Sequence, residues 1–247
     1  MSASFSVLLH DERPPSLVIM VSVGHMRLGT WNLEGKWSDA HAPLMTDAAC
    51  DIWLLTEMPT RTTLPGFTIH ATRARMAPER AWAAVAVRTA LSAKPWKKDP
   101  HPASACADVG GLTFCSSVLP WRSCGGGDPW QGDDTASRTK HAVGRLVAAL
   151  PAASTVWGGD WNHAFDGTEA AGSLAGREEI RAGLTLLGAE LLTASQPHRL
   201  QGLFSIDHIA VPSGRLLTRE ARRLSMQSGG RHLSDHDAYV ADVELAG

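Results

Sequence analysis

The sequence predicts one α/β domain that begins at Met26 and extends over residues 26–247. Short apolar runs bounded by turn residues alternate with stretches of helical composition, a pattern that predicts strands inside a covered sheet. No linker, charge block or low-complexity tract divides this region. A chain of 247 residues is long enough to bury a substantial core in one domain.

Each element is predicted from its own run of residues. Strands are expected where apolar residues follow one another between turn residues, at residues 26–32, 51–57, 82–88, 111–119, 154–160, 205–212 and 237–245. Helices are expected between them, at residues 38–50, 137–150 and 177–187. Residues 123–135 are rich in Gly, Pro and Asp and are expected to form a long loop.

Residues 1–25 are expected to lie outside this domain. Their first apolar run is only SVLL, the acidic pair Asp11 and Glu12 follows it, and no basic segment precedes it. These features are not those of a signal peptide. We expect an N-terminal extension that is disordered or that reflects a mis-assigned start, with the natural start at Met20 or Met26.

Composition narrows the classes of function. Hydrophobic residues make up 44% and charged residues 19%, as in an ordinary globular protein, and the formal net charge of −2 argues against non-specific polyanion binding by the whole chain. It does not argue against a nuclease with a local basic groove. The four cysteines have no metal-type spacing and form no dense disulfide framework, which fits a reducing cytoplasm. No transmembrane run is present, so no membrane partner is expected.

The informative polar residues fall at the ends of apolar runs. Four runs end in an acid or amide, and a fifth run is preceded by an acid and a histidine; the residues are Asn32, Glu34, Glu57, Asp160, Asn162, Asp207, Asp235 and His236. Taken singly, these residues have structural alternatives. Glu57 could be a solvated strand end, and GGDWN could be a tight turn. Asp207 could form a core pair with His208, and His236 could be a core or surface histidine. Carboxylates are rarely buried unless paired or bound to a cation, so together these residues predict one site at one rim of a sheet.

The donor types in this set predict a hard divalent cation. Carboxylate and amide oxygens are the ligands preferred by Mg²⁺ and Mn²⁺, and no thiolate set for Zn²⁺ is present. A zinc protease would also need an HExxH arrangement, and none occurs in the sequence. We therefore expect Mg²⁺ or Mn²⁺ as the cofactor.

The order WN-x-E, LLTE, GDWN, S-x-D-H and SDH resembles the endonuclease/exonuclease/phosphatase superfamily, the deoxyribonuclease-I-like proteins, over residues 27–245. The resemblance implies a four-layered α/β sandwich, in which two packed, mostly antiparallel β-sheets are flanked by helices. It also implies metal-dependent hydrolysis of phosphoester bonds. It implies metal ligands among Asn32, Glu34, Glu57 and Asp235, with Glu57 as the main carboxylate.

The same resemblance implies a catalytic group of four residues. Asp160 would align or deprotonate the attacking water, and Asn162 would bind the scissile phosphate. His236 would contact a phosphate oxygen, with Asp207 orienting its imidazole and raising its pKa. Asp237 is expected to be a turn or strand-edge acid without a catalytic role.

The sequence departs from the family pattern at Val118, which stands in SSVLPW where many relatives have a second histidine. Ser116, Ser117 or Arg122 are candidates to fill that space. The acid and arginine that usually follow the TE motif are not clearly placed, and the candidates are Arg61, Arg73, Arg75 and Glu79.

Nucleic acid is the predicted substrate, and the predicted activity is that of a metal-dependent nuclease acting as a monomer. Four tryptophans could stack on bases or pack in the core: Trp82, Trp96, Trp121 and Trp130. The loop at residues 123–135 is acidic, and no hydrophobic loop suggests docking to a membrane. The alternatives are a phosphomonoesterase or lipid phosphodiesterase of the same fold, or a catalytically weakened phosphate-binding module.

Overall fold

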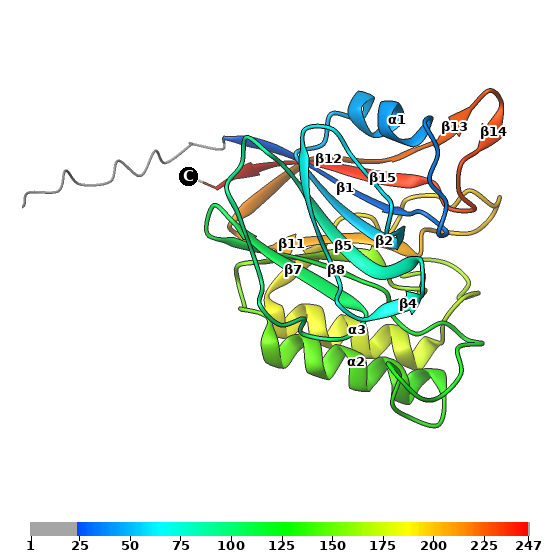
Figure 1. Cartoon of the computed structure of the whole chain (residues 1–247). Coiled ribbons are helices and arrows are strands. Elements are labelled where there is room, and N and C mark those ends of the chain that lie inside the picture. Colours follow the sequence, from blue (N-terminus) through cyan, green and yellow to red (C-terminus); the bar gives the residue numbers. More distant parts are fainter. Residues whose placement is uncertain (1–23, 247) are drawn as a thin grey trace, which may run out of the picture.

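Two β-sheets pack face to face, and helices cover their outer faces (Figure 1). The structure is a computed structural model that describes residues 24–246. Helix α1 (His41–Asp47) lies on the outer side of one sheet, and helices α2 (Thr135–Ala149) and α3 (Leu174–Leu187) lie together on the outer side of the other. This arrangement confirms the predicted four-layered α/β sandwich.

The first sheet has seven strands in the order β12-β15-β1-β2-β5-β3, with β4 paired to β5. Its strands are β1 (His25–Asn32), β2 (Ile52–Pro59), β3 (Phe67–Ala71), β4 (Arg75–Ala77), β5 (Arg80–Arg88), β12 (Leu216–Leu224) and β15 (Ala238–Leu245). Only the β1–β2 pair in this sheet is parallel. Strand β15 therefore begins beside the end of β1, which brings two distant segments of the chain to one rim.

The second sheet has six strands in the order β10-β11-β9-β8-β7-β6. Its strands are β6 (Ala93–Pro95), β7 (Ser104–Val109), β8 (Leu112–Ser117), β9 (Thr155–Asp160), β10 (Ala189–Leu191) and β11 (Asp207–Pro212). Here only the β8–β9 pair is parallel. A short hairpin of β13 (Gln227–Ser228) and β14 (Arg231–His232) precedes β15.

Three apolar clusters fill the spaces between the four layers. Leu54 and Phe114 belong to the cluster between the two sheets, Met45 of α1 to the cluster on one outer face, and Trp157 and Ile180 to the cluster beneath α2 and α3. Both faces of each sheet are thus covered, which explains why the central strands are apolar at successive positions instead of alternate ones.

Some elements differ from their predicted extent. The helix expected over residues 38–50 is limited to α1, because Ala49 adopts φ 54° and ends the helical path. Strand β12, with the sequence LLTREARRL, was not predicted because its charged side chains are exposed at the edge of the sheet. Strand β7, SACADV, was not predicted because its small residues give a weak strand signal.

The predicted N-terminal extension falls mostly on residues 1–23, which lie outside the described residues, while His25 opens β1. All four cysteines are buried free thiols. Within residues 24–246, no helix has both the length and the apolar character needed to cross a bilayer.

Candidate active site

The predicted site residues meet at one rim of the sandwich. Strands β1, β2 and β9 end there, and β11 and β15 begin there. Asp207 opens β11 instead of ending a strand, which corrects the expectation from the sequence. Because β11 runs antiparallel to β9, its first residue is the register partner of Asp160 and still reaches the same rim.

The centre of the site is a buried group of two carboxylates and an imidazole. Asp160, Asp207 and His236 offer ligand atoms that all lie within 4.8 Å of one another. Nδ1 of His236 lies 2.6 Å from Oδ2 of Asp207, and the Asp207 side chain is only 1% exposed. The other carboxylate oxygen of Asp207 is buried and has no hydrogen-bond partner among the described residues. This group therefore holds a charged pair and one unsatisfied acceptor away from bulk water.

His236 is fixed by contacts to the end of β1. The Ser234 hydroxyl donates to the carbonyl oxygen of Asn32 at 2.7 Å and accepts from the backbone N–H of His236 at 3.1 Å. The indole N–H of Trp31 donates to the carbonyl oxygen of His236 at 3.1 Å. The backbone at His236 is therefore held by β1, while its imidazole is held by Asp207 of β11, and such fixed positions are what a pre-organised site needs.

Burial and neighbouring charges shift the pKa values of His236 and Asp160. Burial on its own lowers the pKa of His236, but the charge of Asp207 and the hydrogen bond it accepts outweigh burial and raise that pKa to about 10. Burial raises the pKa of Asp160 to about 7, and the charge of Asp207 acts in the same direction. Near neutral pH His236 is therefore a cation, and the raised pKa makes the Asp160 carboxylate a stronger base than an ordinary aspartate, which suits a general base.

Asn32 links Asp160 to Glu57. Its side-chain Nδ2 donates to Oδ2 of Asp160 at 2.9 Å and to Oε1 of Glu57 at 3.3 Å. The other oxygen of Glu57 accepts from Arg80 at 2.7 Å, and the Glu57 side chain is 18% exposed. Two acids thus share one amide donor, with a single arginine on the solvent side.

Glu34 and Asp235 form the outer edge of the site. Oε2 of Glu34 accepts from the backbone N–H of Asp235 at 2.8 Å and from Lys36 at 2.6 Å. The backbone N–H of Glu34 donates to Oδ1 of Asn32 at 2.8 Å, which connects this edge to Glu57. The side chain of Asp235 is 56% exposed, so this acid faces solvent.

Three predicted site residues have strained backbones. Glu34, Glu57 and Asn162 adopt φ of 52°, 48° and 53°, a region that non-glycine residues rarely occupy. Asn162 is held there because its backbone N–H donates to Asp160 and its Nδ2 donates to the carbonyl oxygen of Leu119. Backbone strain of this kind gathers at functional sites, where surrounding contacts fix it.

The donor set fits a divalent cation on its chemistry. Asn32, Glu34, Glu57 and Asp235 offer only carboxylate and amide oxygens, which Mg²⁺ and Mn²⁺ prefer. The charge of Glu57 also raises the pKa of Asp160, so the rim has an excess of negative charge that a cation would relieve. Among the described residues, the group with metal-site spacing is Asp160, Asp207 and His236. Its close Asp207–His236 ion pair favours a catalytic group over a set of ligands.

Val118 is a buried apolar side chain at the position where the family pattern has a second histidine. Its side chain is 1% exposed and belongs to the cluster beneath α2 and α3. The neighbouring hydroxyls do not replace it: Ser116 donates to the carbonyl oxygen of Leu55, and Ser117 accepts from Trp157. Arg122 binds the carbonyl oxygens of Gly172 and Glu169 and so holds a loop. Of these candidates, none offers a free polar group to the rim.

One residue that contacts the site, Arg80, was not assigned from the sequence. Arg80, not Arg61, Arg73, Arg75 or Glu79, reaches Glu57. Its position opposite Pro59 in the β2–β5 pairing was the available signal, but it required the register of β5 against β2. Asp237 is structural as expected, although it is buried and lies 3.5 Å from Arg223.

Two of the tryptophans considered for stacking belong to the core. Trp82 is 8% and Trp130 4% exposed, and their rings pack edge to face. Trp96 and Trp121 are partly buried against the same cluster. Base stacking by Trp82 or Trp130 is therefore excluded.

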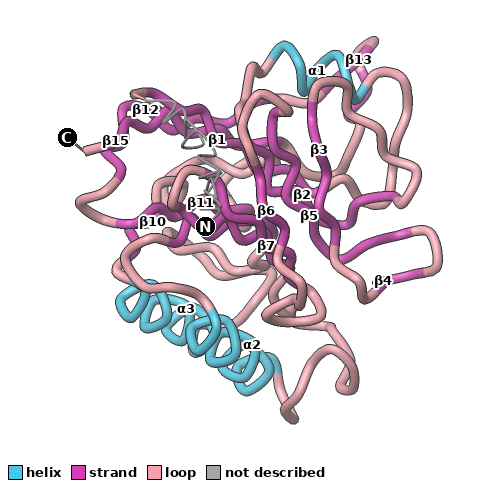
Figure 2. Tube along the Cα trace, turned by 60° about the vertical axis from the view of Figure 1, so that its left-hand side comes forward, coloured by secondary structure: helices cyan, strands magenta, loops and turns pink. Residues whose placement is uncertain are grey.

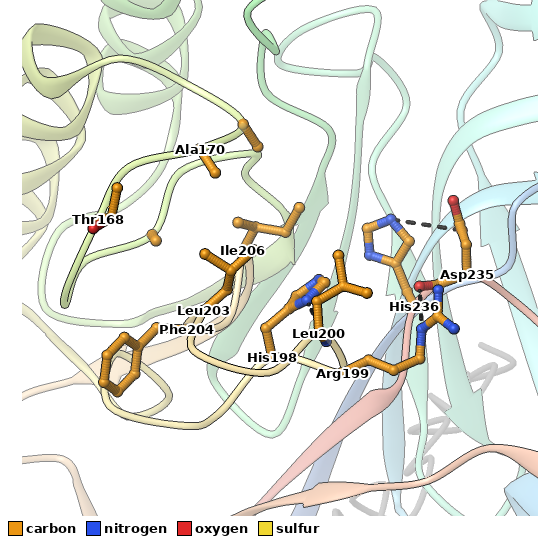
Figure 3. A pocket seen from close by; sticks show the side chains of 12 residues that line it. Thr168, Ala170, His198, Arg199, Leu200, Leu203, Phe204, Ile206, Asp235 and His236 are labelled. Atoms are coloured by element: carbon orange, nitrogen blue, oxygen red, sulfur yellow. Dashed lines mark hydrogen bonds and ion pairs between the residues drawn. The ribbon is translucent and has the colours of Figure 1, made fainter.

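An apolar pocket of about 290 Å³ opens beside His236 (Figure 3). Leu203, Phe204 and Ile206 line one part of it. His198 and Arg199 lie between these apolar residues and His236. The guanidinium Nε of Arg199 donates to the carbonyl oxygen of Asp235 at 2.9 Å. Residues 203–207 thus supply both the site acid Asp207 and an apolar wall next to it.

Comparison with known proteins identifies the fold. No family model matches the chain, and no curated protein matches it. The endonuclease domain of TRAS1, a telomere-specific non-LTR retrotransposon, is similar with a TM-score of 0.65 at 16% identity, over 90% of this chain and 100% of that domain. An AP endonuclease from Archaeoglobus fulgidus is similar with a TM-score of 0.63 at 15% identity, over 87% and 98% of the two chains.

An endonuclease/exonuclease/phosphatase from Bacteroides vulgatus is also similar, with a TM-score of 0.60 at 14% identity, over 90% of this chain and 99% of that chain. Identities this low show the fold alone. The chain therefore has the endonuclease/exonuclease/phosphatase fold, which confirms the resemblance at the level of architecture.

Proposed function

We propose that the protein is a divalent-metal-dependent phosphodiesterase, and specifically a nuclease that hydrolyses DNA or RNA. The observation that carries this proposal is the buried group of Asp160, Asp207 and His236, linked through Asn32 to the carboxylate of Glu57. Similar solved structures, described as an endonuclease domain and as an AP endonuclease, support a nucleic-acid substrate.

The residues present can carry out attack by water on a phosphodiester. Asp160 accepts a proton from the water as the water oxygen bonds to phosphorus. The bond from phosphorus to the leaving oxygen breaks, and that oxygen departs with the electron pair and takes a proton from solvent water. His236, a cation near neutral pH, stabilises the negative charge that builds on the phosphate oxygens. Asp207 keeps the imidazole charged and oriented through their hydrogen bond. Asn162 adds an amide donor that does not repel phosphate.

Asn32, Glu34, Glu57 and Asp235 would hold the cation, with Glu57 as the main carboxylate. When bound, a divalent ion polarises the phosphoryl oxygen and neutralises developing charge. The protein's own contribution is to keep the Glu57 carboxylate close to Asp160 through the shared amide of Asn32.

The apolar pocket beside His236 supports a diester over a simple phosphate. Leu203, Phe204 and Ile206 provide a surface that an uncharged organic group can cover, next to the residue proposed to bind the phosphate. A phosphomonoester of a small polar alcohol would leave this apolar surface exposed to water. A nucleoside attached to the scissile phosphate would cover this apolar surface.

The test is hydrolysis of a substrate panel by purified protein. The panel contains single- and double-stranded DNA and RNA, and phosphomonoesters as the alternative class. We expect cleavage of at least one nucleic acid with Mg²⁺ or Mn²⁺ present, loss of cleavage with a chelator, and recovery on adding the metal back. Phosphate release from monoesters without any cleavage of nucleic acid would contradict the proposal.

Replacing Glu57 with Gln is expected to weaken Mn²⁺ binding by at least about tenfold, because the substitution removes a charged oxygen ligand and keeps the shape. The affinity is measured without substrate, by calorimetry or from the electron paramagnetic resonance of free Mn²⁺. Glu79→Gln is the matched control, because this substitution removes the same charge from an exposed position just before β5.

The variants also separate two possible positions of the ion. An ion held by Asp160, Asp207 and His236 would lose affinity in Asp207→Asn and keep it in Glu57→Gln. That result would show that the ligand set proposed around Glu57 is wrong.

A further inference from the structure

A second cavity, of about 410 Å³, lies where the edges of the two sheets meet. One side is formed by β3 and the residues after it, including His70 and Arg73. The other side is formed by the segment that connects β6 and β7, including Trp96, Lys97 and Asp99. The backbone N–H of Arg73 donates to the Asp99 carboxylate at 2.8 Å and joins the two sides.

Basic residues gather in the two segments that form this cavity, and two of them, Arg73 and Lys97, line it. Residues 94–98 have the sequence KPWKK and contain three of the five lysines of the chain; we call this segment the lysine loop. Arg73 and Arg75 follow β3 on the opposite side. Lys94, Lys97 and Lys98 are exposed, and within residues 24–246 neither they nor these two arginines form an ion pair. Their charge is available to a polyanion.

The cavity also offers an aromatic ring and an unused imidazole nitrogen. The indole N–H of Trp96 donates to Asp108 at 2.9 Å, which fixes the ring while part of it remains exposed. Nε2 of His70 is buried and has no hydrogen-bond partner among the described residues. Asp99 is the one acid that lines the cavity, and burial raises the pKa of its carboxyl group.

The cavity is on the same rim as the candidate active site. Glu57 lies in β2 between the residues that pair with Ala81 and Ala83 of β5. The backbone N–H of Thr72 donates to the carbonyl oxygen of Ala83 at 2.9 Å, so the chain after β3 is level with Glu57. Two strand spacings, about 10 Å, separate their backbones. Figure 2 shows β6 and β7 close to β3 and β5, with the β4 hairpin projecting beside them.

We propose that the lysine loop, with Arg73 and Trp96, is a binding site for single-stranded nucleic acid that holds nucleotides adjoining the phosphate to be cut. The inference rests on the proposed nuclease function. A basic groove combined with an aromatic ring is the chemistry that binds single strands without regard to sequence. The phosphates contact the basic side chains, and a base covers the exposed part of the indole.

The test is binding of a fluorescent oligothymidylate of about 20 nucleotides to the full chain, measured by anisotropy in a chelator to prevent cleavage. We expect the double variant Lys97→Ala/Lys98→Ala to bind about tenfold more weakly than wild type. The slope of log affinity against log salt should fall by about 1.4, since each lost phosphate contact on a single strand contributes about 0.7.

The matched control is Lys140→Ala/Arg219→Ala, which removes the same charge from α2 and from β12 at the opposite edge of the first sheet. Wild-type affinity and salt slope in Lys97→Ala/Lys98→Ala would overturn the proposal, as would equal binding of polyglutamate as competitor. If the protein cuts DNA but both double variants bind it equally, the binding site fails and the nuclease function stands. If the protein binds the oligonucleotide through these lysines but cuts no nucleic acid, the proposed function fails instead.

Discussion

His236→Ala is expected to lower kcat for phosphodiester cleavage by about 10²–10³-fold, because it removes the imidazole proposed to stabilise charge on the phosphate. Val118 provides no second imidazole at this rim, so we expect no compensation from that side. The measurement is single-turnover cleavage at saturating metal, with the substrate that the panel identifies. KM should change less than kcat, because the contact strengthens as charge develops in the transition state.

His141→Ala is the control for this substitution, because His141 lies on the exposed face of α2 and its side chain hydrogen-bonds to the backbone carbonyl oxygen of Gln131. It should cleave at the wild-type rate. A His236→Ala protein that melts like wild type and cleaves within about threefold of its rate would show that the imidazole does not act on the phosphate.

Asp160→Asn is expected to lower kcat by about 10²–10⁴-fold, because the amide cannot accept a proton from water. The substitution keeps the volume of the side chain. It removes a buried charge from the vicinity of Asp207 and Glu57, and it weakens one of the hydrogen bonds that Asp160 accepts. These effects oppose each other, so the free energy of unfolding should stay within about 1–2 kcal/mol of wild type. Asp160→Asn should therefore lose activity while keeping nearly the stability of wild type.

Asp242→Asn serves as the control, because it should lower stability and leave activity unchanged. Asp242 is a buried acid that accepts two hydrogen bonds from Arg27, near the other end of β15. Its loss should lower the free energy of unfolding by about 2 kcal/mol without a loss of kcat. If Asp160→Asn and Asp242→Asn both lose stability and activity together, the loss at Asp160 has a structural cause and the role of general base is wrong.

The architecture was predictable because the central strands are covered on both faces. Such strands are nearly continuous apolar runs, so β2 and β9 stand out in the sequence. Edge strands have no such signal: β12 exposes its charged residues, and β3 is short. The sequence pattern therefore predicted the strands with long apolar runs and missed the edge strands, together with the interior strand β7, whose residues are small.

The candidate site was predictable to the extent that its residues sit next to strong strands. Asp160 ends β9, and His236 precedes β15, so both are marked by the apolar run beside them. Arg80 was not predictable, because its contact with Glu57 depends on the register of β5 against β2. The cavity beside the lysine loop depends on the packing of two sheet edges, which no local pattern encodes.

Hydrolysis at this rim is tested most directly by comparing wild type with the double variant Asp160→Asn/His236→Ala on one fluorescent nucleic acid, with Mn²⁺ and with chelator. We expect wild type to cleave it in a metal-restorable way. The double variant should lose about as much activity as the more damaged of the two single variants, because residues that act as a unit are not additive. Equal cleavage by both proteins would assign the activity to another site or to a contaminant. It would contradict the claim that this rim hydrolyses phosphodiesters.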